Sequence, residues 1–245
     1  MPKFFIPVED VQGDLLVIRE DAHHILHVLR KESGDYLTVC DGHGQDYQCE
    51  IVSAAADGVE CRILQRKPAE TEPLVKLTLF QGLPKAEKME WLLQKGVEIG
   101  ICEFVPVAAE RSIVKLEDKK AASKLTRWNK IAESAAKQSG RGVLPVVQPV
   151  MTVQEAIKTF DKYDLVLVLY EEDRKRSLKT ILRDQKVMPQ NVALWIGPEG
   201  GFEPSEVEQL VSAGAVTAGL GPRILRTETA GMTAAALILY EYDQM

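Results

Sequence analysis

The feature that most constrains the fold is a regular alternation of apolar runs and amphipathic segments, which begins at residue 74. Apolar runs of strand length alternate with stretches that show helical spacing, and the run at 164–170 (DLVLVLY) is almost wholly apolar, as in a strand covered on both faces. Such alternation predicts an α/β domain built on a mostly parallel sheet. Strands are predicted at 74–80, 103–107, 164–170, 192–196 and 216–220, and helices at 85–99, 121–139, 203–212 and 229–242.

Residues 1–70 have a different pattern and predict a separate N-terminal domain. A short helix is predicted over 21–31, with Asp21 able to cap its first turn. Short β-like runs follow at 36–40, 47–52 and 59–64, separated by turn residues. Closely spaced short strands favour a small barrel or compact sheet. The polar, proline-containing stretch 67–73 is predicted to link it to a second domain over 74–245.

The charge pattern concentrates positive charge in the middle of the chain. The net charge is -7 over 1–75, +5 over 76–145 and -4 over 146–245, which sum to the overall -6. A basic middle segment fits a phosphate-facing surface, and it equally fits a solvated helical face.

Targeting and metal signals are weak. There is no apolar run near the ~20 residues that a membrane helix needs, and the N-terminus does not resemble a signal peptide. The four cysteines, at 40, 49, 61 and 102, form no CxxC pair, which favours reduced thiols in a cytoplasmic protein. His23 and His27 are spaced like metal ligands on a helix, but no third ligand is evident, so we expect no metal site.

Two glycine-rich segments each follow a predicted strand and precede a predicted helix. They are WIGPEGGF (195–202) and LGPRILRTETA (220–230), and their strands are expected to be neighbours. Loops at the carboxyl ends of strands are where α/β proteins bind ligands. No phosphate-cradling GxxxxGK[ST] motif is present, and a GxGxxG beginning at Gly219 fails at Ile224. The alternative is that both segments are ordinary turns.

These same two strings resemble the bacterial 16S rRNA (uracil-N3)-methyltransferases of the SPOUT superfamily. Further matching strings are HHILHVLRKESGD (23–35), QGLPKAEKMEWLLQKGVEIG (81–100), ERSIV (110–114) and KQSGR (137–141). The resemblance covers essentially the whole chain in the same order. It implies a C-terminal trefoil-knotted SPOUT methyltransferase domain and an N-terminal PUA-like β-barrel that binds RNA. It also implies a homodimer, S-adenosylmethionine as methyl donor, and N3 of a specific uridine in 16S rRNA of the small ribosomal subunit as target.

Site residues follow from the resemblance by position. The donor pocket is expected to involve Leu169, Gly197, Glu199, Gly200, Gly201, Leu220, Gly221, Ile224, Leu225 and Arg226. The residues expected near the RNA are Lys85, Lys88, Arg111, Gln138 and Arg141.

The chemistry of uracil methylation suggests roles for the charged residues near the loops. The acceptor nitrogen becomes nucleophilic only when its proton leaves, so a cation is needed to stabilise the anion and a carboxylate to accept the proton. Arg226 or Arg141 is expected to stabilise the base, and Glu199 or Glu228 to orient groups or take the proton. Glu228 has an alternative role as a cap of the last helix.

Two other functions remain open at this point. One is a non-catalytic RNA-binding or assembly factor, which would have no affinity for S-adenosylmethionine. The other is a SPOUT enzyme that acts on tRNA.

Overall fold

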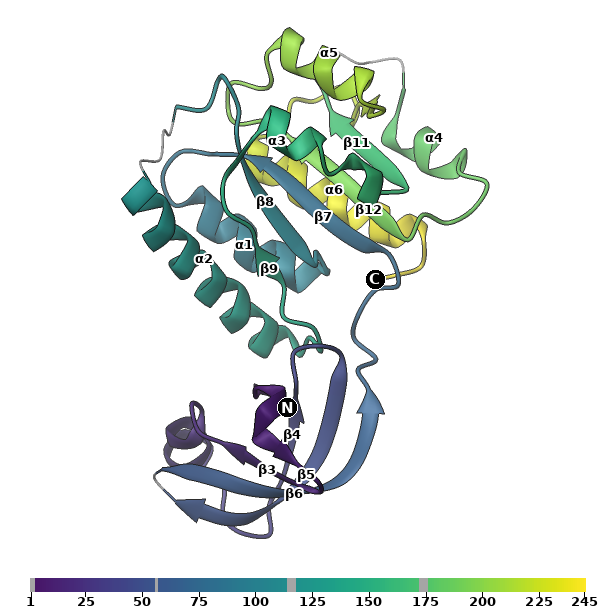
Figure 1. Cartoon of the computed structure of the whole chain (residues 1–245). Coiled ribbons are helices and arrows are strands. Elements are labelled where there is room, and N and C mark those ends of the chain that lie inside the picture. The colour runs from purple at the N-terminus through teal and green to yellow at the C-terminus, as the bar shows by residue number, and fades with distance from the viewer. Residues whose placement is uncertain (1–2, 56, 114–117, 172–175) are drawn as a thin grey trace. The chain divides into compact units, whose positions relative to one another are not determined.

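The chain folds into two compact units, which we describe separately. The computed structural model describes residues 3–55, 57–113, 118–171 and 176–245. The N-terminal unit consists of Met1–Glu72 together with Ala136–Leu144, and the C-terminal unit consists of Pro73–Ala135 with Pro145–Met245 (Figure 1). The segment 136–144 therefore belongs to the N-terminal unit, although the sequence analysis placed it within the second domain.

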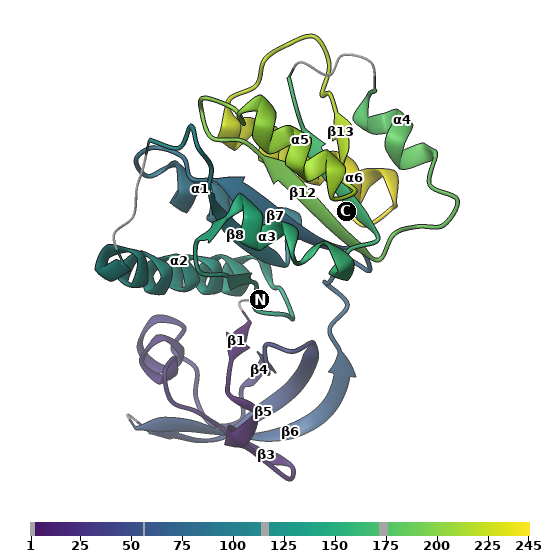
Figure 2. The ribbon, with the colours of Figure 1, turned by 45° about the horizontal axis from the view of Figure 1, so that its top comes forward.

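The N-terminal unit is a curled six-stranded sheet (Figure 2). Its strand order is β1-β4-β5-β6-β3-β2, with antiparallel pairs except for the parallel pair β1–β4. The strands are β1 (Phe4–Phe5), β2 (Val11–Gln12), β3 (Leu15–Ile18), β4 (Tyr36–Cys40), β5 (Gln45–Ala55) and β6 (Gly58–Pro68). The strands predicted from 36 to 64 are confirmed, whereas the three short strands β1–β3 were not predicted.

The curl of this sheet comes from the long hairpin β5–β6. Its register shifts between Gln48 and Cys49 and again between Ile51 and Ser53. An extra residue in one strand bends that strand and increases its twist, which allows the sheet to wrap around a core. Tyr47, Cys49 and Ile51 alternate inward along β5 and are buried in that core.

The helix predicted over 21–31 is wrong in extent and type. The segment holds one π-helical turn, η2 (His24–Val28), anchored by the fully buried Ile25. It ends because Arg30 adopts a left-handed φ of 54°. Asp21 is not a cap, since its carboxylate accepts a 2.9 Å hydrogen bond from the Lys137 ammonium group.

Three cysteines lie inside this unit. Cys40, Cys49 and Cys61 are buried, and all four cysteines of the chain are free. Burial raises the pKa of Cys40 to about 11 and that of Cys49 and Cys61 to about 12. Because the reactive form of cysteine is the thiolate, these three side chains are packing residues and not nucleophiles.

Glu72 attaches the segment 136–144 to the N-terminal unit. Its carboxylate accepts hydrogen bonds from Arg141 Nη2 at 2.6 Å, Arg141 Nε at 3.2 Å, and the backbone N–H groups of Gly142 at 2.8 Å and Val143 at 3.2 Å. The Arg141 side chain is only 4% exposed. Burial alone would raise the pKa of Glu72, but the hydrogen bonds and charge of Arg141 outweigh it and hold that pKa below its usual value.

The C-terminal unit contains an all-parallel sheet, as the sequence predicted. Its strand order is β10-β8-β7-β12-β11-β13, and β9 pairs with β8. The strands are β7 (Lys76–Gly82), β8 (Glu103–Ala108), β9 (Val146–Val147), β10 (Met151–Thr152), β11 (Leu165–Leu169), β12 (Asn191–Ile196) and β13 (Val216–Ala218). The expectation that β12 and β13 are neighbours is wrong, because β11 lies between them.

Helices cover both faces of this sheet, which explains why its strands are apolar on both sides. Helix α6 (Thr227–Glu241) packs against α1 (Lys88–Ile99) and against β7 and β12, with α4 (Leu178–Arg183) beside it. On the other face, α3 (Val153–Ile157) and α5 (Pro204–Ser212) share a core with Phe80 and Trp195 (Figure 1). A further long helix, α2 (Asp118–Ser139), and a short 3-10 turn, η3 (Phe160–Lys162), complete the unit.

Helix α2 contributes to both units. Its first residues belong to the C-terminal unit, where Arg127 makes a 2.7 Å ion pair with Glu90 of α1, and its last residues belong to the N-terminal unit. Over the described ranges, no helix is both long and apolar enough to cross a membrane.

Replacing Glu72 with Gln removes the anion that balances the buried Arg141 guanidinium. We expect the free energy of unfolding to fall by about 2 kcal/mol at neutral pH, measured by urea titration. Because the folded-state pKa of Glu72 is lowered, its contribution is complete above the unfolded-state pKa and is lost as the pH falls through the folded-state value. The gap between wild type and variant should therefore close in acid.

Glu70→Gln is the matched control, since it removes the same charge from an exposed neighbour. A gap between Glu72→Gln and wild type that stays constant down to about pH 2.5 would contradict the assignment.

Candidate functional site

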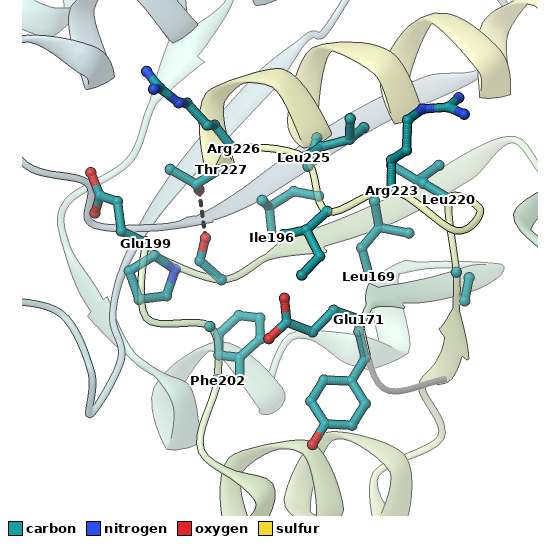
Figure 3. A pocket seen from close by; sticks show the side chains of 18 of the residues that line it. Leu169, Glu171, Ile196, Glu199, Phe202, Leu220, Arg223, Leu225, Arg226 and Thr227 are labelled. Atoms are coloured by element: carbon teal, nitrogen blue, oxygen red, sulfur yellow. Dashed lines mark hydrogen bonds between the residues drawn. The ribbon is translucent and has the colours of Figure 1, made fainter. Parts of the chain in front are cut away.

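A cavity of about 760 Å³ opens at the carboxyl ends of β11, β12 and β13. Three chain segments line most of it, from the ends of their strands onward: 169–171 from β11, 196–202 except Gly200 from β12, and 218–227 from β13 (Figure 3). Lys88, Arg111, Pro204 and Ala230 complete the lining. Because β11 lies between the other two strands, its end forms the part of the wall between the two glycine-rich loops. The volume suits a ligand of nucleoside size.

The first loop depends on the absence of side chains. A Cβ atom on Gly197 would lie 3.0 Å from backbone atoms of Gly201, and Gly201 itself has a φ of +70°. A Cβ atom on Gly82, at the end of the neighbouring β7, would lie 2.5 Å from Pro198. The loop therefore folds back on itself and lies against β7 only because these positions are glycine.

The second loop lines the opposite side of the cavity. Gly221 turns the chain with a φ of +103°, and Leu220 and Leu225 lie beside the cavity in Figure 3. Ile224 also lines the cavity, and it is 81% exposed. The guanidinium groups of Arg223 and Arg226 point away from Leu169 and Ile196 (Figure 3).

A buried hydrogen-bond relay joins the two loops. The Thr227 hydroxyl donates to the Gly197 carbonyl at 2.5 Å and accepts from Gln81 Nε2 at 2.8 Å. Thr227 is buried and Gln81 is fully buried. The sequence analysis did not single out either residue. The available signal was a glutamine next to the apolar run Leu79–Phe80 at the end of β7, because a buried amide needs polar partners.

Lys88 lies between two acidic residues at the edge of the cavity. Its ammonium group is 2.9 Å from Glu199 Oε1 and 3.3 Å from Glu228 Oε2, and the Lys85 backbone N–H donates to Glu199 at 3.1 Å. The hydrogen bond to Glu199 raises the pKa of Lys88. Burial alone would raise the pKa of Glu199, but Lys88 and backbone N–H donors outweigh it and lower that pKa. Both residues therefore stay charged near neutral pH.

Arg111 makes a second ion pair at the cavity. Its Nε and Nη2 atoms donate to Glu203 at 2.6 Å and 2.9 Å, and its Nη1 atom donates to the Gly200 carbonyl at 3.0 Å. The hydrogen bond from Arg111 lowers the pKa of Glu203. The Arg111 side chain thus holds the first loop in place at two points: the Gly200 carbonyl, which belongs to the backbone of that loop, and the carboxylate of Glu203, the residue that precedes α5.

Most of the residues expected in the donor pocket come together at this cavity. Leu169, Gly197, Glu199, Gly201, Leu220, Gly221, Ile224, Leu225 and Arg226 all line it. Gly200 does not, although Arg111 contacts it. Lining residues that the sequence analysis missed include Tyr170, Glu171, Ile196, Phe202 and Thr227.

The other predicted site residues differ in their surroundings. Lys85 is exposed and does not line the cavity, and Glu228 approaches the cavity through its ion pair with Lys88. Glu228 makes no capping hydrogen bond in α6, which begins after Arg226. Gln138 and Arg141 belong to the N-terminal unit, where Arg141 is paired with Glu72, and neither lines the cavity. Among the described residues, no group of three metal-ligating side chains is present.

Fold and site together define a class: a two-unit α/β protein with a small-ligand site between glycine-rich loops. A model of an RNA methyltransferase domain matches residues 70–239, and a model of an RNA methyltransferase PUA domain matches residues 17–64. A ribosomal RNA small subunit methyltransferase E from Bacillus subtilis is 39% identical over 250 residues, which cover 99% of this chain and 98% of that one. A protein of the same name from Mycobacterium tuberculosis is 32% identical over 238 residues, covering 94% and 88%.

Solved structures agree with these sequence matches. A ribosomal RNA small subunit methyltransferase E from Neisseria gonorrhoeae, bound to S-adenosyl methionine, superposes with a TM-score of 0.84 at 31% identity, over 98% of each chain. A putative methyltransferase from Legionella pneumophila in complex with the same compound gives 0.83 at 33% identity, over 98% of this chain and 97% of that one. The chain belongs to this family of RNA methyltransferases.

The relay at Thr227 makes a direct prediction about stability. Thr227→Val keeps the shape of the side chain but leaves the buried Gln81 amide and the Gly197 carbonyl without their shared partner. We expect it to lower the free energy of unfolding by about 1–3 kcal/mol, measured by chemical denaturation. Thr229→Val, at an exposed position of the same helix, should change it by less than about 0.5 kcal/mol. Equal effects of the two substitutions would show that the relay contributes nothing.

Proposed function

We propose that this protein transfers the methyl group of S-adenosylmethionine to N3 of a specific uridine in 16S rRNA of the small ribosomal subunit. The observation that carries the proposal is the cavity between the two glycine-rich loops, which collects nine of the ten residues expected in a donor pocket. Relatives named for ribosomal RNA small subunit methylation favour this substrate over tRNA and favour catalysis over RNA binding alone.

The lining of the cavity fits the parts of the donor. Leu169, Leu220 and Leu225 provide apolar surface for the adenine ring, and the backbone groups of the second loop can read its polar edge. The glycines of the first loop let the main chain approach the ligand closely. When bound, S-adenosylmethionine supplies an activated methyl group, so the protein mainly has to orient two reactants.

The charged residues at the cavity have separate roles in activating the uracil base. We assign stabilisation of the uracil anion to Arg226, because Arg141 is buried against Glu72 in the N-terminal unit. Glu199 lines the cavity and is held ionised by Lys88, which suits a carboxylate that orients the base or accepts its proton. Glu228 is 16% exposed and reaches the site through Lys88, which suits a supporting role.

The RNA contacts proposed from the resemblance fall into two groups. Lys85 and Gln138 are exposed and available to bind phosphate or sugar. Lys88 and Arg111 already pair with Glu199 and Glu203, so we assign them mainly to shaping the cavity. The curled N-terminal sheet, which matches an RNA methyltransferase PUA domain, is the second surface that we propose for RNA.

The quaternary structure and chain path implied by the resemblance are part of the proposal. Helices α1 and α6 pack together and expose Trp91, Leu237 and Tyr240, which supports a homodimer formed through these helices. The chain path that we propose is the trefoil knot of the family that the sequence resembles, and the first loop and the start of α6, joined by the hydrogen bond from Thr227 to Gly197, are parts of that path. An rRNA substrate and four free cysteines support a cytoplasmic location.

Two measurements test the proposed function. Calorimetry should show that the purified chain binds S-adenosylhomocysteine, and mass mapping of 16S rRNA after deletion of the gene should show the loss of one methylated uridine. A chain without affinity for the nucleoside would be an RNA-binding factor. If the deletion strain keeps all 16S rRNA methylation but lacks a methyl group in tRNA, the substrate is tRNA.

The role of the carboxylates predicts a change in the pH dependence of the rate. Glu199→Gln should lower kcat by about 10²-fold and remove the acidic limb of the pH–rate profile, because a carboxamide cannot accept a proton. Glu228→Gln should lower kcat much less and leave the acidic limb in place. An acidic limb that survives in both variants would rule out both carboxylates as the base.

A further inference from the structure

Three of the charged side chains that line the cavity, those of Lys88, Glu199 and Arg111, are neutralised within the protein. Lys88 pairs with Glu199 at 2.9 Å, and Arg111 pairs with Glu203 at 2.6 Å. Arg223 and Arg226 point away from the apolar wall formed by Leu169 and Ile196 (Figure 3). One further carboxylate, that of Glu171, also lines the cavity.

Glu171 occupies the part of the cavity between the two loops. It follows Leu169 and Tyr170 at the carboxyl end of β11, the strand that separates the two loop-bearing strands. In Figure 3 its carboxylate lies inside the cavity, between Ile196 and Phe202. Within the described ranges of the chain, Glu171 makes no hydrogen bond or ion pair, in contrast to Glu199 at the opposite edge.

An unpaired carboxylate inside a ligand cavity favours a cationic ligand. Glu171 is exposed in the open cavity, and a ligand that fills the space beside Ile196 and Phe202 displaces water from around its carboxylate, so a positive charge on that ligand is attracted more strongly than it would be in bulk water. A sulfonium carries a fixed positive charge and has no hydrogen to donate, so a protein recognises its charge by placing a carboxylate, other oxygen atoms or an aromatic face nearby. The cavity provides such a charge in Glu171.

We propose that Glu171 is the donor-specificity residue of this site, whose carboxylate makes the cavity prefer the sulfonium donor to the neutral thioether product. This inference rests on the proposed function and names a residue that the resemblance did not assign. On transfer, the S–CH₃ bond breaks with its electron pair left on sulfur, a bond from uracil N3 to the methyl carbon forms, and the N3 proton leaves to a base. The positive charge on sulfur disappears, and with it the attraction of Glu171 for the ligand.

The functional consequence is a cavity that releases its product. Donor and product share the adenosine and the amino-acid tail, so contacts to those parts hold both equally. The two compounds differ in the methyl group and in the charge on sulfur, and a carboxylate discriminates between them through its interaction with the charge. Loss of that interaction should make S-adenosylhomocysteine a stronger inhibitor relative to the donor.

The test compares the binding of the two nucleosides to the full chain by isothermal titration calorimetry. Glu171→Gln keeps the shape of the side chain and removes its charge. We expect the dissociation constant of S-adenosylmethionine to rise about fivefold and that of S-adenosylhomocysteine to change by less than about twofold. Glu171→Asp, which keeps the charge, should retain most of the wild-type preference for the donor.

Glu208→Gln is the control for net charge, because Glu208 is exposed on α5 and does not line the cavity. It should leave both dissociation constants unchanged. If Glu171→Gln weakens both nucleosides equally, or neither, the inference is overturned while the donor site stands. A wild-type chain that binds neither nucleoside overturns the proposed function, and this inference with it.

Discussion

The hydroxyl of Thr227 is the contact on which the geometry of the site depends. It lies at the first turn of α6 and donates to the carbonyl of Gly197, more than two dozen residues earlier in the chain, while Gln81 holds it from the end of β7. The relay thus joins the ends of β7 and β12 to the start of α6, which are far apart in sequence. It holds the first loop against the start of α6, and the two glycine-rich loops form walls of one cavity.

Charge pairing then sets the chemical character of that cavity. Lys88 and Arg111 are each neutralised by a glutamate of the same chain. Part of the positive charge of the basic segment 76–145 therefore holds the cavity in shape and is not free to bind phosphate. The same pairing keeps Glu199 ionised. It also distinguishes Glu171, whose carboxylate has no such partner in the described chain and faces the space that the ligand would occupy.

Local pattern predicted much of the fold. The apolar runs of β7, β8, β11 and β12 and the strand–helix alternation led directly to the parallel sheet, because a strand buried on both faces must be apolar throughout. The short strands β1, β2 and β3 were not predicted, because a strand of two to four residues is too short to show the alternation of apolar and polar residues that identifies a strand. The segment 21–31 was wrongly predicted to be one continuous helix, because Arg30 adopts a left-handed conformation that cannot be predicted from an arginine side chain.

The sequence alone determined the two-part organisation, the glycine-rich loops and nine of the residues that line the cavity, because these depend on local pattern or on long matching strings. Only the tertiary structure decided which charged side chains pair with each other and which strands are neighbours. It placed β11 between β12 and β13, paired Arg141 with Glu72, and left the carboxylate of Glu171 inside the cavity. The reason is physical: an ion pair or a strand neighbour depends on distances between residues remote in the chain, and no local pattern encodes those distances.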